Sequence, residues 1–218
     1  MILSNTSPSS INKEELIQNG YAHIKYSPLN SIEQTIASFG KTIFKTEIRE
    51  NTSSTRLLAS NKPMNFHSDH YNARFIAWFC NSQSIAGGES LLIDAYQLIN
   101  SFSESSKNLL TEITIKSHNV FYGDKLSYPL LSLNEGKIES VYYAPWMVNT
   151  PGCIKHKKAL EKFENLVKEI NPVKILLSEG DLLIIDNHRM LHGREGFPSA
   201  SNRWLTRYWL SDNTNQNK

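Results

Sequence analysis

The sequence predicts a mostly β fold, built from antiparallel strands with a few peripheral α-helices. Short segments with strand-like patterning recur along the chain, separated by turns that contain Gly, Pro and Asn. The regular alternation of strand and helix that marks a parallel sheet is scarce, and no internal repeat is present. With 218 residues, 39% of them hydrophobic, the chain is long enough for one domain with a substantial core.

Each element is predicted from its apolar pattern and from the residues that stop it. The clearest helix covers residues 157–170, where apolar side chains recur at helical spacing before Asn171-Pro172. Further helices are expected over residues 13–19, 31–39, 95–100 and 104–111. Strands are expected over residues 21–26, 74–80, 90–93, 114–122, 138–143, 181–186 and 203–210. We therefore expect a flexible lead-in at residues 1–12, a single domain at 13–211 and a polar tail at 212–218.

The charge balance and the cysteine count exclude several classes of protein. Basic and acidic residues number 23 and 21, so the chain lacks the basic excess typical of nucleic-acid-binding proteins. No apolar run approaches the roughly 18 residues of a membrane helix, and the first residues do not resemble a secretory signal. Two cysteines are too few for a disulfide scaffold. We expect a cytoplasmic protein with no nucleic-acid or membrane partner.

The first candidate metal motif is His67-Ser68-Asp69. Positions i and i+2 of an extended backbone face the same side, so this imidazole and this carboxylate can reach one metal ion. The same three residues also fit a short polar loop without a metal. Taken alone, the motif leaves both interpretations open, and the loop is the commoner of the two.

The second candidate motif follows the apolar segment 181–186. A polar turn leads from that segment to His192, which would add a third ligand to His67 and Asp69. Two histidines and one carboxylate are the ligand set of non-haem Fe(II) oxygenases, and they leave three positions of the ion open. His188 is the rival ligand, but its place beside an Asp-Asn turn favours a hydrogen-bonding role.

The third candidate motif is the alternating segment 203–210. Its alternation places Arg203, Leu205, Arg207 and Trp209 on one face. Two arginines on an aromatic, inward face need anionic partners, because burying an unpaired charge is costly. A small dicarboxylate held between a metal and an arginine would provide one such partner, since guanidinium binds carboxylate in a bidentate fork. An ion pair with Asp or Glu elsewhere is the alternative.

Together these motifs resemble the taurine dioxygenase and gamma-butyrobetaine hydroxylase family of Fe(II)/2-oxoglutarate-dependent oxygenases. The resemblance runs from about residue 14 to residue 210. Phe66 to Asp69 resembles the family's first metal motif, residues 180–194 its distal-histidine motif and residues 203–210 its arginine strand. Gly87-Gly88-Glu89-Ser90 is similar to the turn whose hydroxyl helps to hold 2-oxoglutarate, with Ser in place of the commoner Thr.

The resemblance implies a double-stranded β-helix (jelly-roll) core and a dioxygenase that uses Fe(II), 2-oxoglutarate and O2. It implies that His67, Asp69 and His192 hold the iron, and that Arg203 and Ser90 hold the 5-carboxylate of 2-oxoglutarate. Arg207 would then face the 1-carboxylate of 2-oxoglutarate or an acidic group of the substrate. Which of the two arginines anchors 2-oxoglutarate stays open, with Arg203 favoured.

Substrate contacts are predicted less specifically. His70 and Asn65 would line the cavity or serve as hydrogen-bonding residues of the loop. Residues 142–149 resemble a stretch that borders the substrate in relatives, which makes Trp146 and Asn149 candidates, although aromatic residues there also suit a core. Trp78 and Phe79 are expected in the core. By family analogy, the substrate is a small polar metabolite such as an amino acid or an amine derivative.

Alternatives to hydroxylation stay open at this point. Family members can instead desaturate, cyclise or cleave a substrate, and a non-enzymatic jelly-roll protein could keep the metal site to bind a ligand. Asp69 stands where halogenating relatives have a small non-ligand residue, which favours oxidation over halogenation. The chain is shorter than many relatives between Ser90 and Gly180, where subunit contacts lie in the family. The resemblance therefore leaves a homo-oligomer possible without predicting one.

Overall fold

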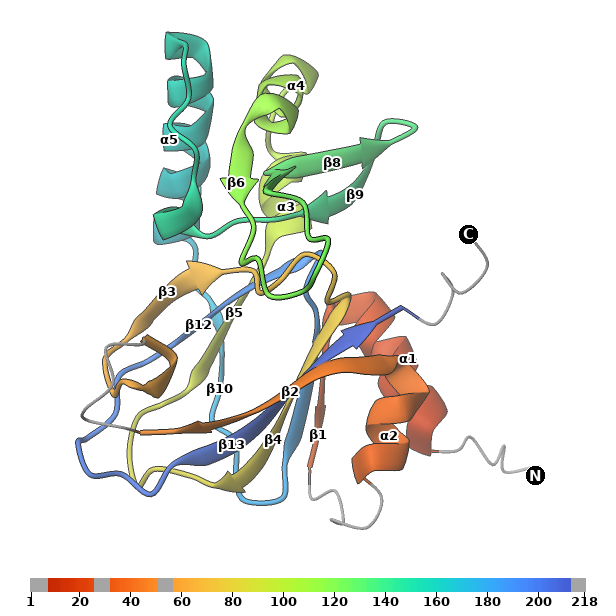
Figure 1. Cartoon of the computed structure of the whole chain (residues 1–218), viewed down its shortest axis with the longest axis vertical. Helices are drawn as coiled ribbons and strands as arrows, with labels where there is room; N and C mark the ends of the chain where they lie inside the picture. Colours follow the sequence, from red (N-terminus) through yellow and green to blue (C-terminus); the bar gives the residue numbers. More distant parts are fainter. Residues whose placement is uncertain (1–7, 26–31, 51–56, 213–218) are drawn as a thin grey trace.

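The computed structural model describes residues 8–25, 32–50 and 57–212. Two antiparallel sheets face each other and form a jelly-roll core (Figure 1). The five-stranded sheet has the order β1 (Tyr21–Ile24), β11 (Leu182–Asp186), β4 (Phe75–Ser82), β13 (Trp204–Ser211) and β2 (Lys41–Arg49). The four-stranded sheet has the order β10 (Val173–Ile175), β5 (Ser90–Asp94), β12 (Met190–Arg194) and β3 (Met64–His67). The predicted mostly β, jelly-roll fold is confirmed.

Helices and two small hairpins cover the sheets. α1 (Pro8–Asn19) and α2 (Ile32–Phe39) pack beside the five-stranded sheet, whereas α3 (Ala95–Asn100), α4 (Glu104–Glu112) and α5 (Ile154–Glu169) stand above one end of the barrel (Figure 1). The hairpins are β6 (Thr114–Lys116) with β7 (Ser127–Pro129), and β8 (Leu131–Asn134) with β9 (Lys137–Val141). Two 3₁₀ turns complete the described elements, η2 (Leu57–Ala59) and η3 (Pro145–Met147). None of the described helices is long and apolar enough to cross a membrane.

The register of the strands determines which side chains meet inside the barrel. In the four-stranded sheet His192 lies opposite His67, and Arg194 lies opposite Ser90. In the five-stranded sheet Arg207 lies opposite Trp78. Neighbouring strands place opposite residues within about 4.5–5.5 Å at their Cβ atoms, so each pair can act on one ligand. The two sheets thus bring chemically active residues from both halves of the chain to one interior space.

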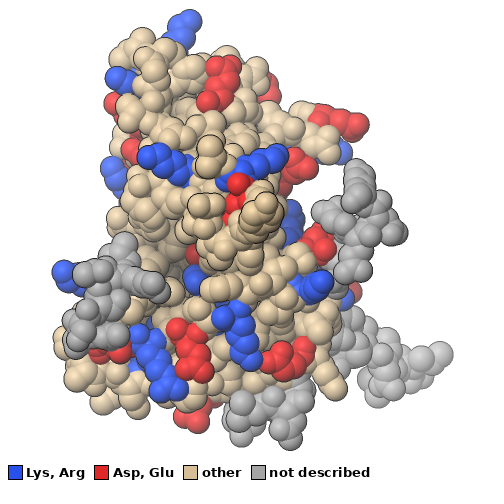
Figure 2. All heavy atoms as spheres, in the orientation of Figure 1, with Lys and Arg blue, Asp and Glu red and all other residues tan. Residues whose placement is uncertain are grey.

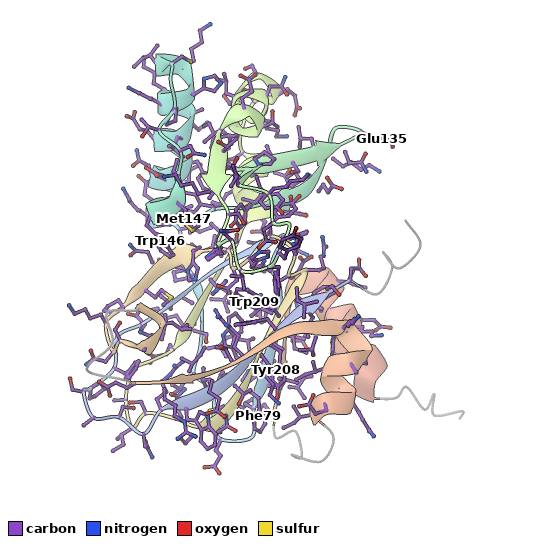
Figure 3. The ribbon with its side chains drawn as sticks, viewed as in Figure 1. Phe79, Glu135, Trp146, Met147, Tyr208 and Trp209 are labelled. Atoms are coloured by element: carbon purple, nitrogen blue, oxygen red, sulfur yellow. The ribbon has the colours of Figure 1, made fainter. Side chains whose placement is uncertain are left out.

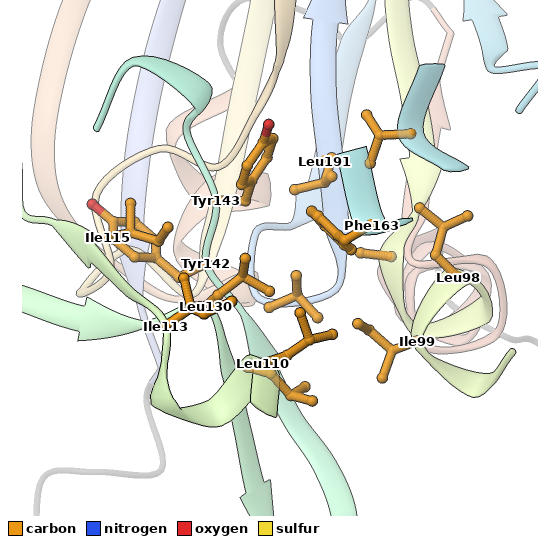
Figure 4. Close-up of a cluster of buried hydrophobic side chains, with 14 of the residues drawn as sticks. Leu98, Ile99, Leu110, Ile113, Ile115, Leu130, Tyr142, Tyr143, Phe163 and Leu191 are labelled. Carbon is orange, nitrogen blue, oxygen red and sulfur yellow. The ribbon is translucent and has the colours of Figure 1, made fainter. Parts of the chain in front are cut away.

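Three hydrophobic clusters stabilise this arrangement. One lies between the sheets, a second lies between the five-stranded sheet and the N-terminal helices, and the third joins α3, α4 and α5 to the hairpins (Figure 4). Phe163 of α5 is fully buried in the third cluster, as are Leu110 of α4 and Ile99 of α3. Burial of each such side chain stabilises the fold by roughly 1.5–3 kcal/mol. The helical layer is therefore part of the same folded unit as the end of the barrel that carries the site.

Most predicted elements are present, with shifted ends. α3 matches its predicted range, and α5 begins three residues earlier than expected. α1 begins at Pro8, so the expected flexible lead-in over residues 1–12 is wrong for residues 8–12; residues 1–7 lie outside the described part of the chain. The tail at 213–218 likewise lies outside it.

The strand predicted over residues 114–122 is wrong beyond Lys116. The chain leaves β6 there and turns, with Asn119 at a left-handed φ of 48°. The carboxylate of Asp124 accepts hydrogen bonds from the backbone N–H groups of Val120 and Phe121 at 2.8 and 2.7 Å. An Asp that satisfies local backbone donors offers the chain an alternative to strand pairing.

Several strands were missed altogether, namely β2, β3, β7, β8, β10 and β12. Most are three to five residues long, too short for alternation to distinguish a strand from a loop. β2 is longer, but its exposed face carries charged side chains, and its pairing with β13 is what orders it. These strands depend on long-range partners rather than on their own residues.

Charged side chains are interspersed on the face shown in Figure 2, where basic and acidic groups alternate over the barrel and the helices. Mixed charge of this kind produces no large field of one sign on that face.

Candidate active site

A cluster of His67, Asp69 and His192 lies in the interior between the two sheets. His67 is the last residue of β3, Asp69 follows two residues later, and His192 is the central residue of β12. Because His67 and His192 are register partners, their ring centroids lie 4.3 Å apart. One potential ligand atom from each of the three residues lies within 4.8 Å of the others, and all three residues are buried. Among the described residues, this is the one group of three or more metal-ligating side chains that converges in this way.

The imidazoles are neutral at neutral pH. Burial lowers the pKa of His192 to about 3 and also lowers the pKa of His67. His67 Nδ1 donates to the backbone carbonyl of Asn65 at 2.8 Å, which leaves its Nε2 lone pair free. That Nε2 lies 3.7 Å from Asp69 Oδ1, and His192 Nε2 lies 3.9 Å from the same oxygen. Three potential metal-ligand atoms, one from each side chain, therefore face one point.

Asp69 is held from the opposite sheet. Its Oδ2 accepts hydrogen bonds from Arg207 Nη1 at 2.7 Å and from Trp209 Nε1 at 2.8 Å. Burial alone would raise the pKa of this carboxyl, but the cation at Arg207 and the hydrogen bond from the Trp209 N–H help to hold the pKa well below its usual range. The carboxylate is therefore ionised, as a metal ligand requires.

A buried amide positions the loop that carries Asp69. Asn187, in the turn between β11 and β12, accepts a hydrogen bond from the Asp69 N–H at 2.9 Å and donates to the carbonyls of His70 and Ala73 at 3.3 and 2.9 Å. The sequence predicts only a turn at Asp186-Asn187 and does not assign Asn187 a role. The available signal is a second polar residue directly after the strand-ending Asp186.

A cavity adjoins the triad and reaches Arg203. Besides His67 and His192, its lining combines apolar residues with Ser90 and three arginines; the remaining members are Ile48, Leu58, Met64, Trp78, Leu92, Gly193, Arg194, Arg203, Leu205 and Arg207. The predicted common face of Arg203, Leu205 and Arg207 is thus confirmed. The cavity is therefore lined both by two of the three clustered side chains and by three arginines.

Arg203 is the cation in this cavity that most needs an anion. Its side chain is buried, its Nη2 makes a long hydrogen bond of 3.4 Å to the Gly88 carbonyl, and its Nε has no hydrogen-bond partner in the described chain. Burial, together with the neighbouring charge of Arg194, lowers its pKa to about 10. No ion pair joins Arg203 to a carboxylate among the described residues, whereas a buried cation is stable only with a compensating partner.

The glycines of the predicted turn allow this arginine to approach the backbone. Gly88 has a left-handed φ of 76°, and a Cβ atom there would lie 3.0 Å from Arg203 Nε and 3.2 Å from Arg203 Cδ. Glycine is the residue that adopts such a φ without strain and leaves this space open. The absence of a side chain at Gly88 therefore leaves room for Arg203, and Ser90 lines the cavity two residues later.

Arg194 is a cavity residue that the sequence analysis missed. It is buried, lies opposite Ser90 in the sheet, and donates from Nη2 to the carbonyls of Ser60 and Lys62 at 2.6 and 2.7 Å. The Nε of Arg194 has no partner among the described residues, and burial lowers the pKa of the guanidinium. Its position two residues after His192, on the same strand face, was the available signal.

Trp78 lies in the core, as expected, and it also forms a wall of the site. Its ring meets the His192 ring edge-on at a centroid distance of 5.0 Å, and it lines the cavity. Trp146 of η3 lies on the open side: its ring is 5.1 Å from the His67 ring, and 48% of the residue is exposed. Figure 3 shows Trp146 where the helical layer meets the barrel, with Trp209 deeper inside.

The other candidate residues are placed away from the cavity lining. His70 is fully buried, with Nε2 donating to Asp124 at 2.8 Å and Nδ1 accepting from the Asn72 N–H at 3.1 Å, so it is a hydrogen-bonding residue of the loop. The side chain of Asn65 is exposed. The amide of Asn149 donates to Thr114 Oγ1 at 2.8 Å.

His188 does not join the metal-ligand cluster. Its Nε2 donates to the Tyr71 carbonyl at 2.8 Å, and its Nδ1 accepts from Arg74 at 3.2 Å. The hydrogen-bonding role expected for His188 is therefore confirmed.

Comparison with protein families identifies the chain. Residues 29–209 match the family model described as "Taurine catabolism dioxygenase TauD, TfdA family". The chain belongs to this family. The resemblance inferred from the four sequence motifs is thereby confirmed, and the TauD/TfdA match covers the residues that line the cavity and both sheets apart from β1 and the last two residues of β13.

Two curated relatives illustrate the diversity of the TauD/TfdA family. The 3-((Z)-2-isocyanoethenyl)-1H-indole synthase of Fischerella ambigua (strain UTEX 1903) is 29% identical over 199 residues, which cover 80% of this chain and 72% of the relative. Dioxygenase str8 of Strobilurus tenacellus is 26% identical over 191 residues, or 76% of this chain. The chain spans 45% of the length of Dioxygenase str8.

Solved structures with the same fold include two oxygenases. An asparagine oxygenase in complex with Fe(II), 2S,3S-3-hydroxyasparagine and succinate has a TM-score of 0.72 at 14% identity, covering 94% of this chain and 80% of that chain. The non-heme iron oxygenase OrfP in complex with Fe and alpha-ketoglutaric acid has a TM-score of 0.72 at 16% identity, covering 93% and 78%. At these identities the likeness establishes the shared fold.

The donor set in this chain fits Fe(II). Two neutral imidazole nitrogens and one carboxylate oxygen converge on one point, and N and O donors in this ratio suit a ferrous ion with open positions. The unpartnered Nε of Arg203, within the same cavity, fits an anionic second ligand. The residues present therefore suit an iron ion together with a small keto-diacid.

Proposed function

We propose that the protein is an Fe(II)- and 2-oxoglutarate-dependent dioxygenase that hydroxylates a C–H bond of a small, polar, amino-acid-like metabolite. The observation that carries this proposal is the cavity that joins a buried His-Asp-His cluster to a buried arginine, Arg203, which has no carboxylate partner among the described residues. An iron-bound 2-oxoglutarate supplies the oxidation by O2 of an unactivated C–H bond, with release of succinate and carbon dioxide.

His67, Asp69 and His192 would hold the ferrous ion. At neutral pH all three side chains can bind a cation, because burial keeps both imidazoles neutral and Arg207 keeps the carboxyl ionised. Neither imidazole is expected to transfer a proton, and the contribution of these residues is position and charge. Trp78 packs against His192 and excludes water from that side of the cluster.

Arg203 would anchor the 5-carboxylate of 2-oxoglutarate at the far end of the cavity. Its orphaned Nε and its weakly engaged Nη2 supply two donors, the pattern that binds a carboxylate in a bidentate fork. The Ser90 hydroxyl lines the same cavity and adds a third donor. Arg194 adds positive charge beside Arg203 and Ser90. Its hydrogen bonds to the carbonyls of Ser60 and Lys62 hold that segment against the site.

The substrate would enter on the side of Trp146. That ring is half exposed and lies over His67, so it can contact a molecule bound beside the metal. Of the other candidate contacts, Asn65 has an exposed side chain, whereas His70 and Asn149 are engaged in hydrogen bonds of their own. The asparagine oxygenase of the same fold binds 3-hydroxyasparagine, which supports a substrate of this size and polarity.

A second outcome, desaturation or a related oxidation, is supported by the indole-synthase relative. Nothing in the cluster itself distinguishes the two outcomes, because both begin at a C–H bond placed beside the metal. Product mass separates them, since hydroxylation adds one oxygen atom and desaturation removes two hydrogen atoms. A binding protein without catalytic activity would need neither the arginine anchor nor Ser90.

The test is a screen for succinate release. The protein is loaded with Fe(II) and 2-oxoglutarate in air and incubated with amino acids, amines, sulfonates and carrier-linked amino acids. The masses of the products are measured by mass spectrometry. We expect one class to raise succinate formation well above the substrate-free rate in wild type and not in His192→Ala. Succinate formation that persists in His192→Ala would overturn the assignment of the cluster.

The cellular setting is part of the same proposal. The two cysteines are free thiols, Cys80 buried and Cys153 exposed, as expected for a protein of a reducing compartment such as the cytoplasm. The family resemblance leaves a homo-oligomer open without predicting one, and light scattering measures the oligomeric state.

A further inference from the structure

The two oxygens of the Asp69 carboxylate make different contacts. Oδ2 accepts two hydrogen bonds from β13, one from Arg207 Nη1 at 2.7 Å and one from Trp209 Nε1 at 2.8 Å. Oδ1 faces His67 Nε2 and His192 Nε2 at 3.7 and 3.9 Å. The two donors and the carboxylate are all buried, so water does not compete for these contacts. The two oxygens of one side chain therefore have different environments.

The two donors also fix each other. The Arg207 guanidinium lies 4.9 Å from the centre of the Trp209 ring, and that ring packs against Phe44 at a centroid distance of 4.9 Å. Arg207 and Trp209 lie on one face of β13, two residues apart, so a single strand presents both. Asp69 is held from its backbone as well, because its N–H donates to Asn187 at 2.9 Å. The carboxylate has little freedom to rotate.

A fixed carboxylate limits how many positions it can occupy on a metal ion. A carboxylate can bind through one oxygen or through both, and a rotation of the group separates the two modes. Donors on Oδ2 occupy the lone pairs of that oxygen, and the guanidinium charge repels a cation from it. Only Oδ1 then remains for the ion, so two histidines and Asp69 fill three positions and leave the other three open.

We infer that Arg207 and Trp209 are positioning residues that keep Asp69 as a one-oxygen metal ligand, so that room remains for a two-donor cosubstrate and O2. This inference rests on the proposed function. It also gives Arg207 a role other than the carboxylate anchor expected from the sequence. Arg207 acts through Asp69, whereas Arg203 has no such partner. Partners that orient metal ligands typically change metal affinity about 10- to 100-fold when they are removed.

The test uses two variants that keep the formal charge of the site. Trp209→Phe removes one donor and retains an aromatic ring, and Arg207→Lys retains the cation but loses the rigid fork. Tyr208→Phe, on the opposite face of the same strand, is the matched control. Mn(II) binding to the metal-free protein is measured by calorimetry, and the visible spectrum of the Co(II)-loaded protein reports the ligand geometry. If Trp209→Phe does not fold, Arg207→Lys carries the test.

We expect each variant to bind Mn(II) about 10- to 100-fold more weakly than wild type and to change the Co(II) spectrum, with Tyr208→Phe unchanged. Wild-type Mn(II) affinity and an unchanged Co(II) spectrum in a folded variant would overturn the inference. A wild-type protein that binds no Mn(II) at all would instead contradict the proposed function, so the two failures are distinguishable.

Discussion

At the scale of single residues, two arginines on one strand face have different surroundings. Arg207 is paired with Asp69 at 2.7 Å, whereas Arg203 makes no ion pair with a carboxylate among the described residues and donates one long hydrogen bond of 3.4 Å to a backbone carbonyl. Sequence alternation placed both on the inner face but could not distinguish them, because their partners come from residues more than a hundred positions away. The free arginine is the one expected to bind an added anion.

Replacing Arg203 tests this difference. Arg203→Ala is expected to raise the KM for 2-oxoglutarate about 10- to 100-fold, since hydrogen bonds to charged groups contribute about 1.5–3 kcal/mol. Mn(II) affinity is expected to stay within about twofold of wild type, because Arg203 does not contact the three metal-ligand residues. Steady-state kinetics with varied 2-oxoglutarate provide the measurement. An unchanged KM, with a raised KM in Arg207→Ala instead, would show that the roles are reversed.

The three residues proposed as metal ligands could be selected from the sequence because each lies in a local motif. His67-Ser68-Asp69 is readable from spacing, and His192 from the apolar strand and polar turn before it. Asn187, Arg194 and Trp78 could not be assigned in this way. Their roles depend on register and on contacts between sheets, such as Arg194 opposite Ser90 and Trp78 against His192. The sequence of one strand does not specify which strand it pairs with or which side chains of the facing sheet it contacts.

At the scale of elements, the approach of β12 to β3 determines the distance between the two imidazoles. Gly193 lies between His192 and Arg194, and a Cβ atom at this position would lie 2.8 Å from the Met64 carbonyl and 3.4 Å from the Phe66 ring. The register between these strands also shifts at this point. The absence of a side chain at Gly193 therefore permits the close pairing that joins His67 to His192.

Gly193→Ala is expected to push β3 away from β12. The added methyl group should destabilise the fold by about 1–3 kcal/mol, as overpacking typically does, and weaken Mn(II) binding. Gly152→Ala is the control, because a Cβ atom there has nothing within 4 Å. Urea denaturation and calorimetry check both effects. Equal Mn(II) affinity in the two variants would contradict the claim that metal binding depends on the spacing between β3 and β12.

The turn between β11 and β12 has a pH-sensitive contact. Burial lowers the pKa of His188 to about 4 from the ordinary histidine value of about 6.5, so between these pH values the folded protein keeps it neutral while the unfolded chain binds a proton. The contribution of His188 to stability is therefore complete above pH 6.5 and is lost as the pH falls from 6.5 towards 4. A shift of this size corresponds to a loss of no more than about 3 kcal/mol.

The corresponding variant is His188→Gln. The stability difference between wild type and His188→Gln, measured by urea denaturation without added metal, is expected to shrink as the pH falls from 6.5 to 4. Other histidines titrate equally in both proteins, so their effects cancel in the difference. A difference that stays constant over this range would contradict the assigned burial of His188.

Element prediction succeeded where local signals were strong. α3 is capped by Asp94, whose side chain accepts hydrogen bonds from the N–H groups of Tyr96 and Gln97, and its range was predicted in full. The strand predicted over residues 114–122 failed because the side chain of Asp124 satisfies the backbone of Val120 and Phe121. Short strands such as β3 and β12 were missed because pairing, and not composition, orders them.

At the scale of the whole molecule, the site couples the two sheets. The four-stranded sheet supplies His67 and His192, and the five-stranded sheet supplies the donors that hold Asp69. An ion bound at this junction binds the native state and not the unfolded chain, so binding must stabilise the fold as a whole. The overall architecture, a mostly antiparallel fold with peripheral helices, was predictable because the many short strands excluded the alternatives.

Mn(II) should therefore raise the melting temperature. At a free concentration of 100 times Kd the added stability is about 2.7 kcal/mol, which corresponds to a rise of about 5–10 °C for a chain of this size. His192→Ala is expected to show no metal-dependent rise. Thermal denaturation with and without Mn(II) checks this, and an equal rise in both proteins would place the metal elsewhere.

The most direct measurement of the central claim is the visible absorption of the protein titrated with Fe(II) and 2-oxoglutarate without oxygen. If His67, Asp69 and His192 hold one ferrous ion beside Arg203, a weak charge-transfer band should appear and saturate at one equivalent of iron. The band should be absent in His192→Ala and should need more 2-oxoglutarate in Arg203→Ala. A wild-type protein that stays colourless, or a band that survives in His192→Ala, would contradict this account.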